Sequence, residues 1–242
     1  YFLVTASFYA RFLRYMAPLA PFLLVFAAGG ATALYRRLNL SGRRALWAAG
    51  GLAAIFTIAW ALAFSSIYTQ EHPWVQASRW IYQNIPADST LLSEAWDDAL
   101  PLTLIGAPDR PAQVTYHQAA LPMWDVDTAA KLDTLAEQLS HADYVTLATS
   151  RLSAPIQRLS SRYPISSRYY ALLFSGKLGY TLVASFSNTP HLGPLQVADS
   201  HADESFWVYD HPRALIFANT GHLTAAELRA LLSRRPATAL DT

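Results

Sequence analysis

The chain begins with two uncharged apolar runs, residues 15–35 and 45–70, joined by a short basic loop. The loop contains four arginines and no acidic residue: Arg36, Arg37, Arg43 and Arg44. A helix of about 20 apolar residues crosses the hydrocarbon core of a bilayer. The pattern therefore predicts transmembrane helices at about 15–35 and 45–68, with two buried helices of a soluble protein as the alternative.

The basic loop predicts the orientation of this hairpin. Short loops rich in Arg and Lys stay in the cytoplasm. The segment Ala10–Pro21 and the whole chain from Glu71 onward are then expected on the other side. The sequence thus predicts a multi-pass protein of the cell membrane, in contact with the lipid bilayer, with an extracytoplasmic soluble domain.

Helical and strand patterns alternate in the polar part of the chain, at least from Ser89 to Thr149. Such alternation is typical of a small α/β layer domain. The expected helices are 72–84, 129–140, 168–175 and 224–233, and the expected strands are 89–95, 113–118, 144–149, 180–187, 206–209 and 214–218. The predicted organisation is a membrane part at 1–70, a soluble α/β domain at 71–234 and a flexible tail at 235–242.

The composition of the chain argues against several classes of function. The formal net charge of +1 and the lack of a basic stripe outside the loop argue against nucleic-acid binding. The chain of 242 residues contains no cysteine, which excludes a disulfide framework and a thiolate metal site. It opens at Tyr1 inside an apolar stretch without the features of a signal peptide. We expect it to be the C-terminal part of a longer membrane protein.

Two arginines, Arg11 and Arg14, precede the first apolar run, and Pro18 and Pro21 follow them. The guanidinium group binds phosphate oxygens through a planar fork, while its stem lies along apolar surface. Proline interrupts the start of a helix and leaves backbone groups free near the membrane surface. This segment could hold a lipid-linked phosphate; the alternative is arginines that extend to the interface without a ligand.

The stretch 14–21, Arg-Tyr-Met-Ala-Pro-Leu-Ala-Pro, resembles the R-Y-x-x-P-x-x-P element of polyprenyl-phosphate-dependent glycosyltransferases of the GT-C fold. Bacterial members of glycosyltransferase family 39 carry it, among them relatives of the protein O-mannosyltransferases and the lipid A aminoarabinose transferases. Residues 77–86, 94–101 and 204–212 are similar to the C-terminal domains of such proteins.

The resemblance implies transfer of a sugar from a polyprenyl-phosphate donor to an acceptor on the outer face. It marks Arg11, Arg14 and Tyr15 as candidate contacts of the donor lipid phosphate. The catalytic acid of the family, an Asp in the first external loop, has no matching position in this chain. No catalytic residue is therefore assigned, and a non-catalytic membrane-anchored binding or structural module is the alternative function.

Glu94, Trp96, Asp97 and Asp98 form the densest acidic and aromatic group of the soluble part. They could contact a sugar by stacking and hydrogen bonding, or their carboxylates could bind a divalent cation. The alternative is a loop whose Asp residues cap turns and whose Trp packs beneath it. No other metal site or cofactor is expected, since no H-x-x-x-H or H-E-x-x-H spacing occurs.

Overall fold

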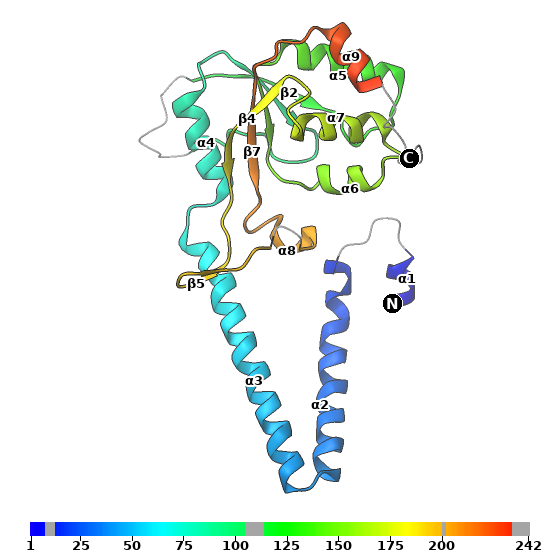
Figure 1. Cartoon of the computed structure of the whole chain (residues 1–242), viewed down its shortest axis with the longest axis vertical. Helices are drawn as coiled ribbons and strands as arrows, with labels where there is room; N and C mark the ends of the chain where they lie inside the picture. The colour runs from blue at the N-terminus through cyan, green and yellow to red at the C-terminus, as the bar shows by residue number, and fades with distance from the viewer. Residues whose placement is uncertain (8–12, 105–113, 200–201, 234–242) are drawn as a thin grey trace, which may run out of the picture. The chain divides into compact units, whose positions relative to one another are not determined.

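The computed structural model describes residues 1–7, 13–104, 114–199 and 202–233. The chain forms two compact units. The first unit combines residues 1–70 with the later segment 189–210, and the second combines 71–188 with 211–242. Figure 1 shows both units along the chain, and each is treated separately below.

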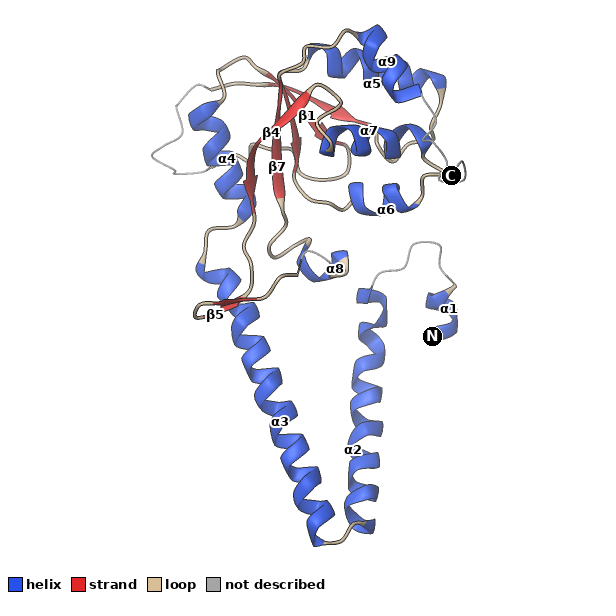
Figure 2. Cartoon of the chain, viewed as in Figure 1, coloured by secondary structure: helices blue, strands red, loops and turns tan. Residues whose placement is uncertain are grey.

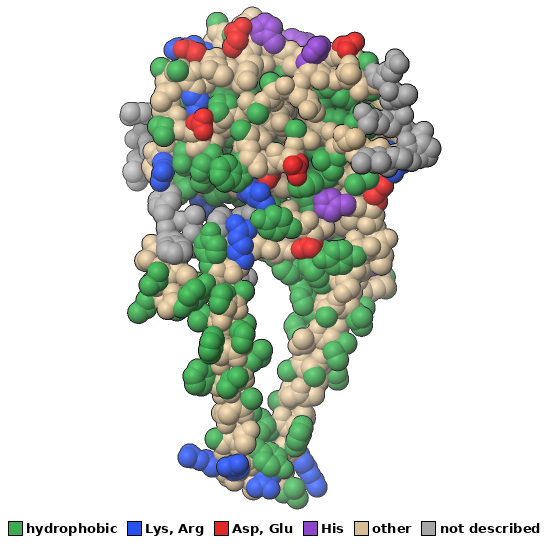
Figure 3. Space-filling view, turned by 180° about the vertical axis from the view of Figure 1, so that it is seen from behind, with side chains coloured by type: hydrophobic (Ala, Val, Ile, Leu, Met, Phe, Trp, Pro, Cys, Tyr) green, Lys and Arg blue, Asp and Glu red, His purple; other side chains and the backbone are tan. Residues whose placement is uncertain are grey.

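The first unit contains two long apolar helices, α2 (Ala20–Arg37) and α3 (Leu40–Ser65). Both are long and apolar enough to cross a membrane, and their most hydrophobic stretches are not buried within the chain. Figure 3 shows hydrophobic side chains along both helices and basic ones gathered at the turn between them. Shorter helices flank them: α1 (Phe2–Ala6), η1 (Leu13–Leu19) and η2 (Ser66–Thr69).

Proline sets where the first long helix begins. The element η1, a 3-10 helix, contains Pro18, and Pro21 occupies the first turn of α2. Proline lacks the backbone N–H of a helix interior but suits the first turn, where that group has no partner. The first run therefore does not form one α-helix from residue 15, and the expected interruption by the prolines is confirmed.

Local chemistry closes the turn between the two long helices. The side chain of Asn39 caps α3 by accepting a hydrogen bond of 2.9 Å from the backbone N–H of Gly42. Arg43 donates through Nε to the carbonyl oxygen of Tyr35 at 3.1 Å, and its guanidinium carbon lies 4.7 Å from the centre of the Tyr35 ring. One of the basic residues thus binds a carbonyl in the last turn of α2, where helical partners are missing.

The later segment of the first unit is a short hairpin followed by a helical turn. Strand β5 (His191–Leu192) pairs antiparallel with β6 (Leu195–Gln196), and α8 (Glu204–Trp207) follows. The predicted strand at 206–209 is wrong, because Phe206 and Trp207 belong to α8. The reason is local: Asp203 Oδ1 accepts a 2.9 Å hydrogen bond from the backbone N–H of Ser205, which favours a helical turn.

The second unit is built on a five-stranded mixed sheet of order β2-β1-β3-β7-β4, shown in red in Figure 2. Strand β1 is parallel to both of its neighbours, whereas β7 is antiparallel to β3 and β4. The strands are β1 (Thr90–Glu94), β2 (His117–Leu121), β3 (Tyr144–Leu147), β4 (Tyr180–Phe186) and β7 (Ala214–Asn219). The predicted α/β class is confirmed.

Helices cover both faces of this sheet. Adjacent strand residues point to opposite faces, so Leu91 packs with α4 and Leu92 packs with the helices of the other face. The helices are α4 (Pro73–Asn84) on one face and α5 (Ala129–His141), α6 (Ser153–Arg158), α7 (Pro164–Phe174) and α9 (Ala225–Ser233) on the other.

Two expectations for this unit were wrong in detail, and one helix was missed. The strand expected at 113–118 is β2 at His117–Leu121, because its register is fixed by pairing Thr90 with His117 and Glu94 with Leu121. Helix α7 begins at Pro164 rather than at residue 168, and α6 was not predicted. Helix α9 begins as expected, with Thr224 and Glu227 forming a reciprocal capping box.

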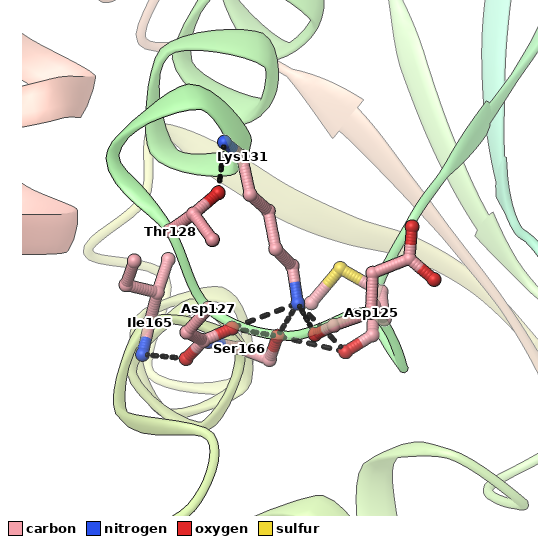
Figure 4. A network of polar contacts seen from close by, with 7 residues as sticks. Asp125, Asp127, Thr128, Lys131, Ile165 and Ser166 are labelled. Atoms are coloured by element: carbon pink, nitrogen blue, oxygen red, sulfur yellow. Dashed lines mark hydrogen bonds and ion pairs between the residues drawn. The ribbon is translucent and has the colours of Figure 1, made fainter.

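A buried lysine holds the start of α5 and the start of α7 together (Figure 4). Lys131 is 6% exposed, and its Nζ donates to the carbonyl oxygens of Met123 at 3.0 Å and Asp125 at 2.7 Å. The same ammonium lies 2.8 Å from Asp127 Oδ1 and 2.7 Å from Ser166 Oγ. This buried charge therefore has both an opposite charge and hydrogen-bond partners, as burial requires.

The carboxylate of Asp127 completes this network. Its Oδ2 accepts hydrogen bonds from the backbone N–H groups of Ile165 at 2.5 Å and Ser166 at 3.3 Å, in the first turn of α7. These donors have no partner within the helix, and a negative charge is favoured at a helix N-terminus. Asp127 thereby fixes the position of α7 against the loop after β2.

Replacing Lys131 by Met should leave the Asp127 carboxylate buried without its counter-ion. We expect Lys131→Met to lower the free energy of unfolding by about 3–5 kcal/mol, as for other broken buried pairs. The measurement is urea unfolding of the chain in detergent micelles, followed by circular dichroism. Lys177→Met, at an exposed position, is the matched control. A loss below about 1 kcal/mol in Lys131→Met, the range of a surface pair, would contradict the role given to this network.

Candidate functional site

The carboxyl ends of β1 and β3 form the place where this sheet is best suited to bind a ligand. The chain leaves β1 toward β2 on one side, and leaves β3 toward β7 and β4 on the other. In open sheets with parallel strands, ligands bind at the carboxyl ends where the connections diverge in this way. Glu94 is the last residue of β1, and Thr149 and Arg151 follow β3.

Glu94 is buried there beside two tyrosines of α7. It is 3% exposed, and its Oε1 accepts a hydrogen bond from the hydroxyl of Tyr170. Its Oε2 is buried and has no hydrogen-bond partner among the described residues, and the same holds for the hydroxyl of Tyr169. The rings of Tyr169 and Tyr170 meet edge to face with centres 5.0 Å apart. Two buried polar atoms thus remain available beside the end of β1.

The pKa of Glu94 is raised from 4.5 to about 8, and burial is the largest cause. The hydrogen bond from Tyr170 lowers this pKa, whereas the charge of Asp97 raises it. At neutral pH the folded protein therefore holds Glu94 largely as the neutral acid. Burial, followed by the charge of Glu94, also raises the pKa of both tyrosines, which remain protonated.

Asp97, in the loop after β1, connects the site to the residues that follow β3. Its Oδ1 lies 2.9 Å from Nη1 of Arg151, and its Oδ2 accepts a hydrogen bond from the hydroxyl of Thr149. The Thr149 oxygen in turn accepts a 3.0 Å hydrogen bond from the backbone N–H of Arg151. The Asp97 side chain is 4% exposed and that of Arg151 is 20% exposed. The loops after β1 and β3 are therefore tied together by an ion pair at the edge of the sheet.

In the loop after β1 the side chain of Asp97 is buried, whereas those of Trp96 and Asp98 are exposed. Trp96 has a φ of 123°, a conformation that costs energy in any residue except glycine, and its side chain is 72% exposed. Asp98 is exposed as well. The expectation that the Trp packs beneath the loop is thus wrong. A strained backbone that holds an aromatic ring in water beside buried polar groups is typical of a binding site.

The three carboxyl groups do not converge on a cation. Glu94 faces Tyr170, Asp97 faces Thr149 and Arg151, and Asp98 lies at the surface. Within the described parts of the chain, no group of three or more His, Asp or Glu side chains could hold a metal ion. The divalent-cation interpretation of this group is therefore wrong, because each buried carboxyl has its own protein partner.

The residues expected at the donor phosphate lie in the first unit. Arg14 is exposed in η1, with its guanidinium carbon 5.8 Å from the centre of the Tyr15 ring. The carbonyl oxygen of Tyr15 accepts a 2.6 Å hydrogen bond from the hydroxyl of Tyr1. Arg11 lies outside the described residues. Arg14 and Tyr15 thus lie near the start of η1, the element that precedes α2.

Sequence reasoning found Glu94, Trp96 and Asp97 but missed their partners. Thr149 is the last residue of the strand predicted at 144–149, and Arg151 follows two residues later, so the rule for carboxyl ends of parallel strands could have identified them. Tyr169 and Tyr170 had no such signal, because only the packing of α7 brings them to Glu94.

Comparison with known proteins gives no matching family model, no matching curated protein and no matching solved structure. The functional interpretation therefore depends on the geometry and on the sequence element before α2.

Glu94→Gln should change how stability depends on pH. The unfolded chain ionises Glu94 near pH 4.5, whereas its pKa in the folded protein is about 8. The stabilisation from the buried acid is thus complete below pH 4.5 and is lost as the pH rises toward 8, by about 1.4 kcal/mol per pH unit. Glutamine keeps the shape without a titrating proton, so the variant should gain stability relative to the parent between pH 5 and pH 8.

Urea unfolding of parent and variant at several pH values measures this difference. Asp98→Asn, at the exposed carboxyl of the same loop, is the control and should follow the parent profile. A stability difference between Glu94→Gln and the parent that does not change with pH would show that Glu94 is not held as the neutral acid.

Proposed function

We propose that this chain is the C-terminal part of an integral-membrane glycosyltransferase that takes a sugar from a polyprenyl-phosphate donor. In this proposal α2 and α3 cross the membrane, and the second unit lies outside the cytoplasm. The observation that carries the proposal is the segment before α2, where Arg14 and Tyr15 precede a proline-interrupted start. It is the element that resembles the donor-binding segment of the polyprenyl-phosphate-dependent enzymes.

The chemistry assigned to this segment is stabilisation of the leaving group. An acceptor hydroxyl forms a bond to the anomeric carbon of the sugar while the bond from that carbon to the phosphate oxygen breaks. The acceptor proton passes to a general base elsewhere in the full protein. Negative charge grows on the departing polyprenyl phosphate, and the guanidinium of Arg14 would hold it through paired hydrogen bonds.

The site at β1 and β3 is assigned to the acceptor. The exposed ring of Trp96 offers a stacking surface, and the next residue along the loop, Asp97, pairs with the partly exposed Arg151. A hydroxyl-rich acceptor such as a glycan suits this combination of an aromatic face and polar groups.

Arg14→Ala should lower the rate of sugar transfer by about tenfold or more, because loss of one charge-stabilising donor costs at least this much in comparable sites. The assay uses the full-length protein in membranes with labelled polyprenyl-phosphate sugars. Arg36→Ala, in the last turn at the opposite end of α2, is the matched control and should retain activity. Equal turnover in Arg14→Ala and the parent would refute the assignment of Arg14 to the donor.

A second candidate function is a non-catalytic membrane-anchored module that binds glycans. The exposed and strained Trp96 favours it, since a binding site requires no catalytic acid within the chain. The two functions differ in whether a labelled donor sugar is transferred to a glycan that binds at this site.

Trp96→Ala should weaken glycan binding about tenfold through the loss of one aromatic stacking surface. Calorimetric titration of the protein in detergent with soluble oligosaccharides measures it, and transfer by the full-length protein should show the same change in the acceptor KM. Val126→Ala, which removes another exposed apolar side chain of this unit, is the control. Unaltered affinity in Trp96→Ala would remove Trp96 from the site.

A further inference from the structure

The segment Thr189–Asp210, which we call the collar, is inserted between β4 and β7 but packs with the first unit. It is fastened to the end of α3 and to η2. The hydroxyl of Ser66 accepts a 2.9 Å hydrogen bond from the backbone N–H of His191 and lies 2.9 Å from His191 Nδ1. The Tyr68 hydroxyl donates to Asp210 Oδ1 at 2.5 Å. Both ends of the collar are therefore tied to one helix end. Figure 1 shows β5 beside the end of α3.

Aromatic contacts carry the collar further along α3. The ring of Phe206, in α8, stacks on Trp60 with centres 5.8 Å apart and lies 5.1 Å from the ring of Phe64. Trp60 precedes the last residue of α3 by five positions, which is about 7.5 Å along the helix axis. The collar thus covers the final turns of α3, and its contacts with the helix extend from Trp60 to Ser66.

The length of α3 indicates how deep in a bilayer the contacts between the collar and α3 would lie. From Ala45, the first residue after the arginines of the turn, to Ser65 there are 21 residues, which span about 31 Å. This equals the hydrocarbon thickness of a bilayer, about 30 Å. With Arg43 and Arg44 at one headgroup layer, Ser65 lies at the opposite boundary, and the contacts of the collar lie at or just below it.

The collar exposes apolar side chains at this level. Leu192 is 42% exposed and Leu195 is 69% exposed, on either side of the turn between β5 and β6. Tyr209 is 61% exposed, and Tyr68 beside the collar is 63% exposed. Tyrosine is enriched where a membrane protein meets the headgroup region. The charged residues of the collar are all acidic, Asp199, Asp203, Glu204 and Asp210, so attraction to anionic lipids cannot hold it.

We propose that the collar is an interfacial anchor whose β5–β6 turn inserts Leu192 and Leu195 into the outer leaflet of the bilayer beside α3. This inference rests on the proposed crossing of the membrane by α3 and goes beyond the transfer reaction. Insertion of the two leucines adds apolar burial that does not depend on anionic lipid. The anchor keeps two points of the chain close to the lipid headgroups. These are the junction before β5 and the junction after α8.

Site-directed spin labelling tests the depth directly, because the chain contains no cysteine. Leu195→Cys is labelled, and the protein is reconstituted in phosphatidylcholine bilayers. Collision of the label with oxygen, which concentrates in lipid, is compared with collision with a water-soluble nickel chelate. Ile55→Cys, 65% exposed in α3, is the lipid reference, and Val126→Cys, 76% exposed in the second unit, is the water reference.

We expect the label at Leu195 to collide more with oxygen than with nickel, as at Ile55, and the label at Val126 to show the opposite preference. If Ile55 has the lipid signature and Leu195 resembles Val126, the anchor is refuted while the membrane crossing stands. If Ile55 itself is accessible to nickel, the crossing fails and the anchor with it. Shielding of Leu195 from both reagents would indicate a second copy of the chain on this surface and would also refute the anchor.

Discussion

The second unit depends on the interactions of one carboxylate, that of Asp127. One of its oxygens neutralises the buried ammonium of Lys131, and the other accepts the backbone N–H groups that begin α7. Three separate pieces of chain, the loop after β2, the start of α5 and the start of α7, are thus joined through a single side chain. Because a buried charge is costly without its partners, these pieces can move only together.

The candidate site is a consequence of this arrangement. Asp127 fixes the first turn of α7, and the same helix brings Tyr169 and Tyr170 to the end of β1. Glu94 is then buried, which raises its pKa and keeps it neutral although the hydrogen bond from Tyr170 acts in the opposite direction. The neighbouring Asp97 stays in an ion pair with Arg151. Two carboxyl groups three residues apart therefore offer different chemistry, a neutral donor and a paired acceptor, beneath an exposed Trp96.

The first unit follows a different constraint. Its helices satisfy their backbone hydrogen bonds internally and leave their apolar side chains uncovered by the protein. Such a surface is stable only in contact with another apolar phase. At one end of α3, Phe206 of the collar contacts Trp60 and Phe64, while Leu192 and Leu195 of the collar stay exposed. Anchoring the collar in the bilayer would explain why a segment between two strands of the sheet packs with the helices instead.

The sequence by itself determined the features that depend only on residues close together along the chain. The length of the uncharged runs predicted the two long helices, and the prolines predicted where the first of them is interrupted. The helical patterns at 129–140 and 224–233 predicted α5 and α9. Each of these is set by local hydrogen bonding or by length. The acidic and aromatic group at 94–98 was also visible, because its residue types are unusual for a simple loop.

Tertiary structure alone decided the rest. The position of β2 depends on its register with β1. The grouping of 189–210 with the helices, the partnership of Glu94 with Tyr170 and the tie from Asp97 to Arg151 join residues far apart along the chain. Local patterns do not encode such contacts, because burial and charge pairing act between surfaces that exist only once the chain has folded.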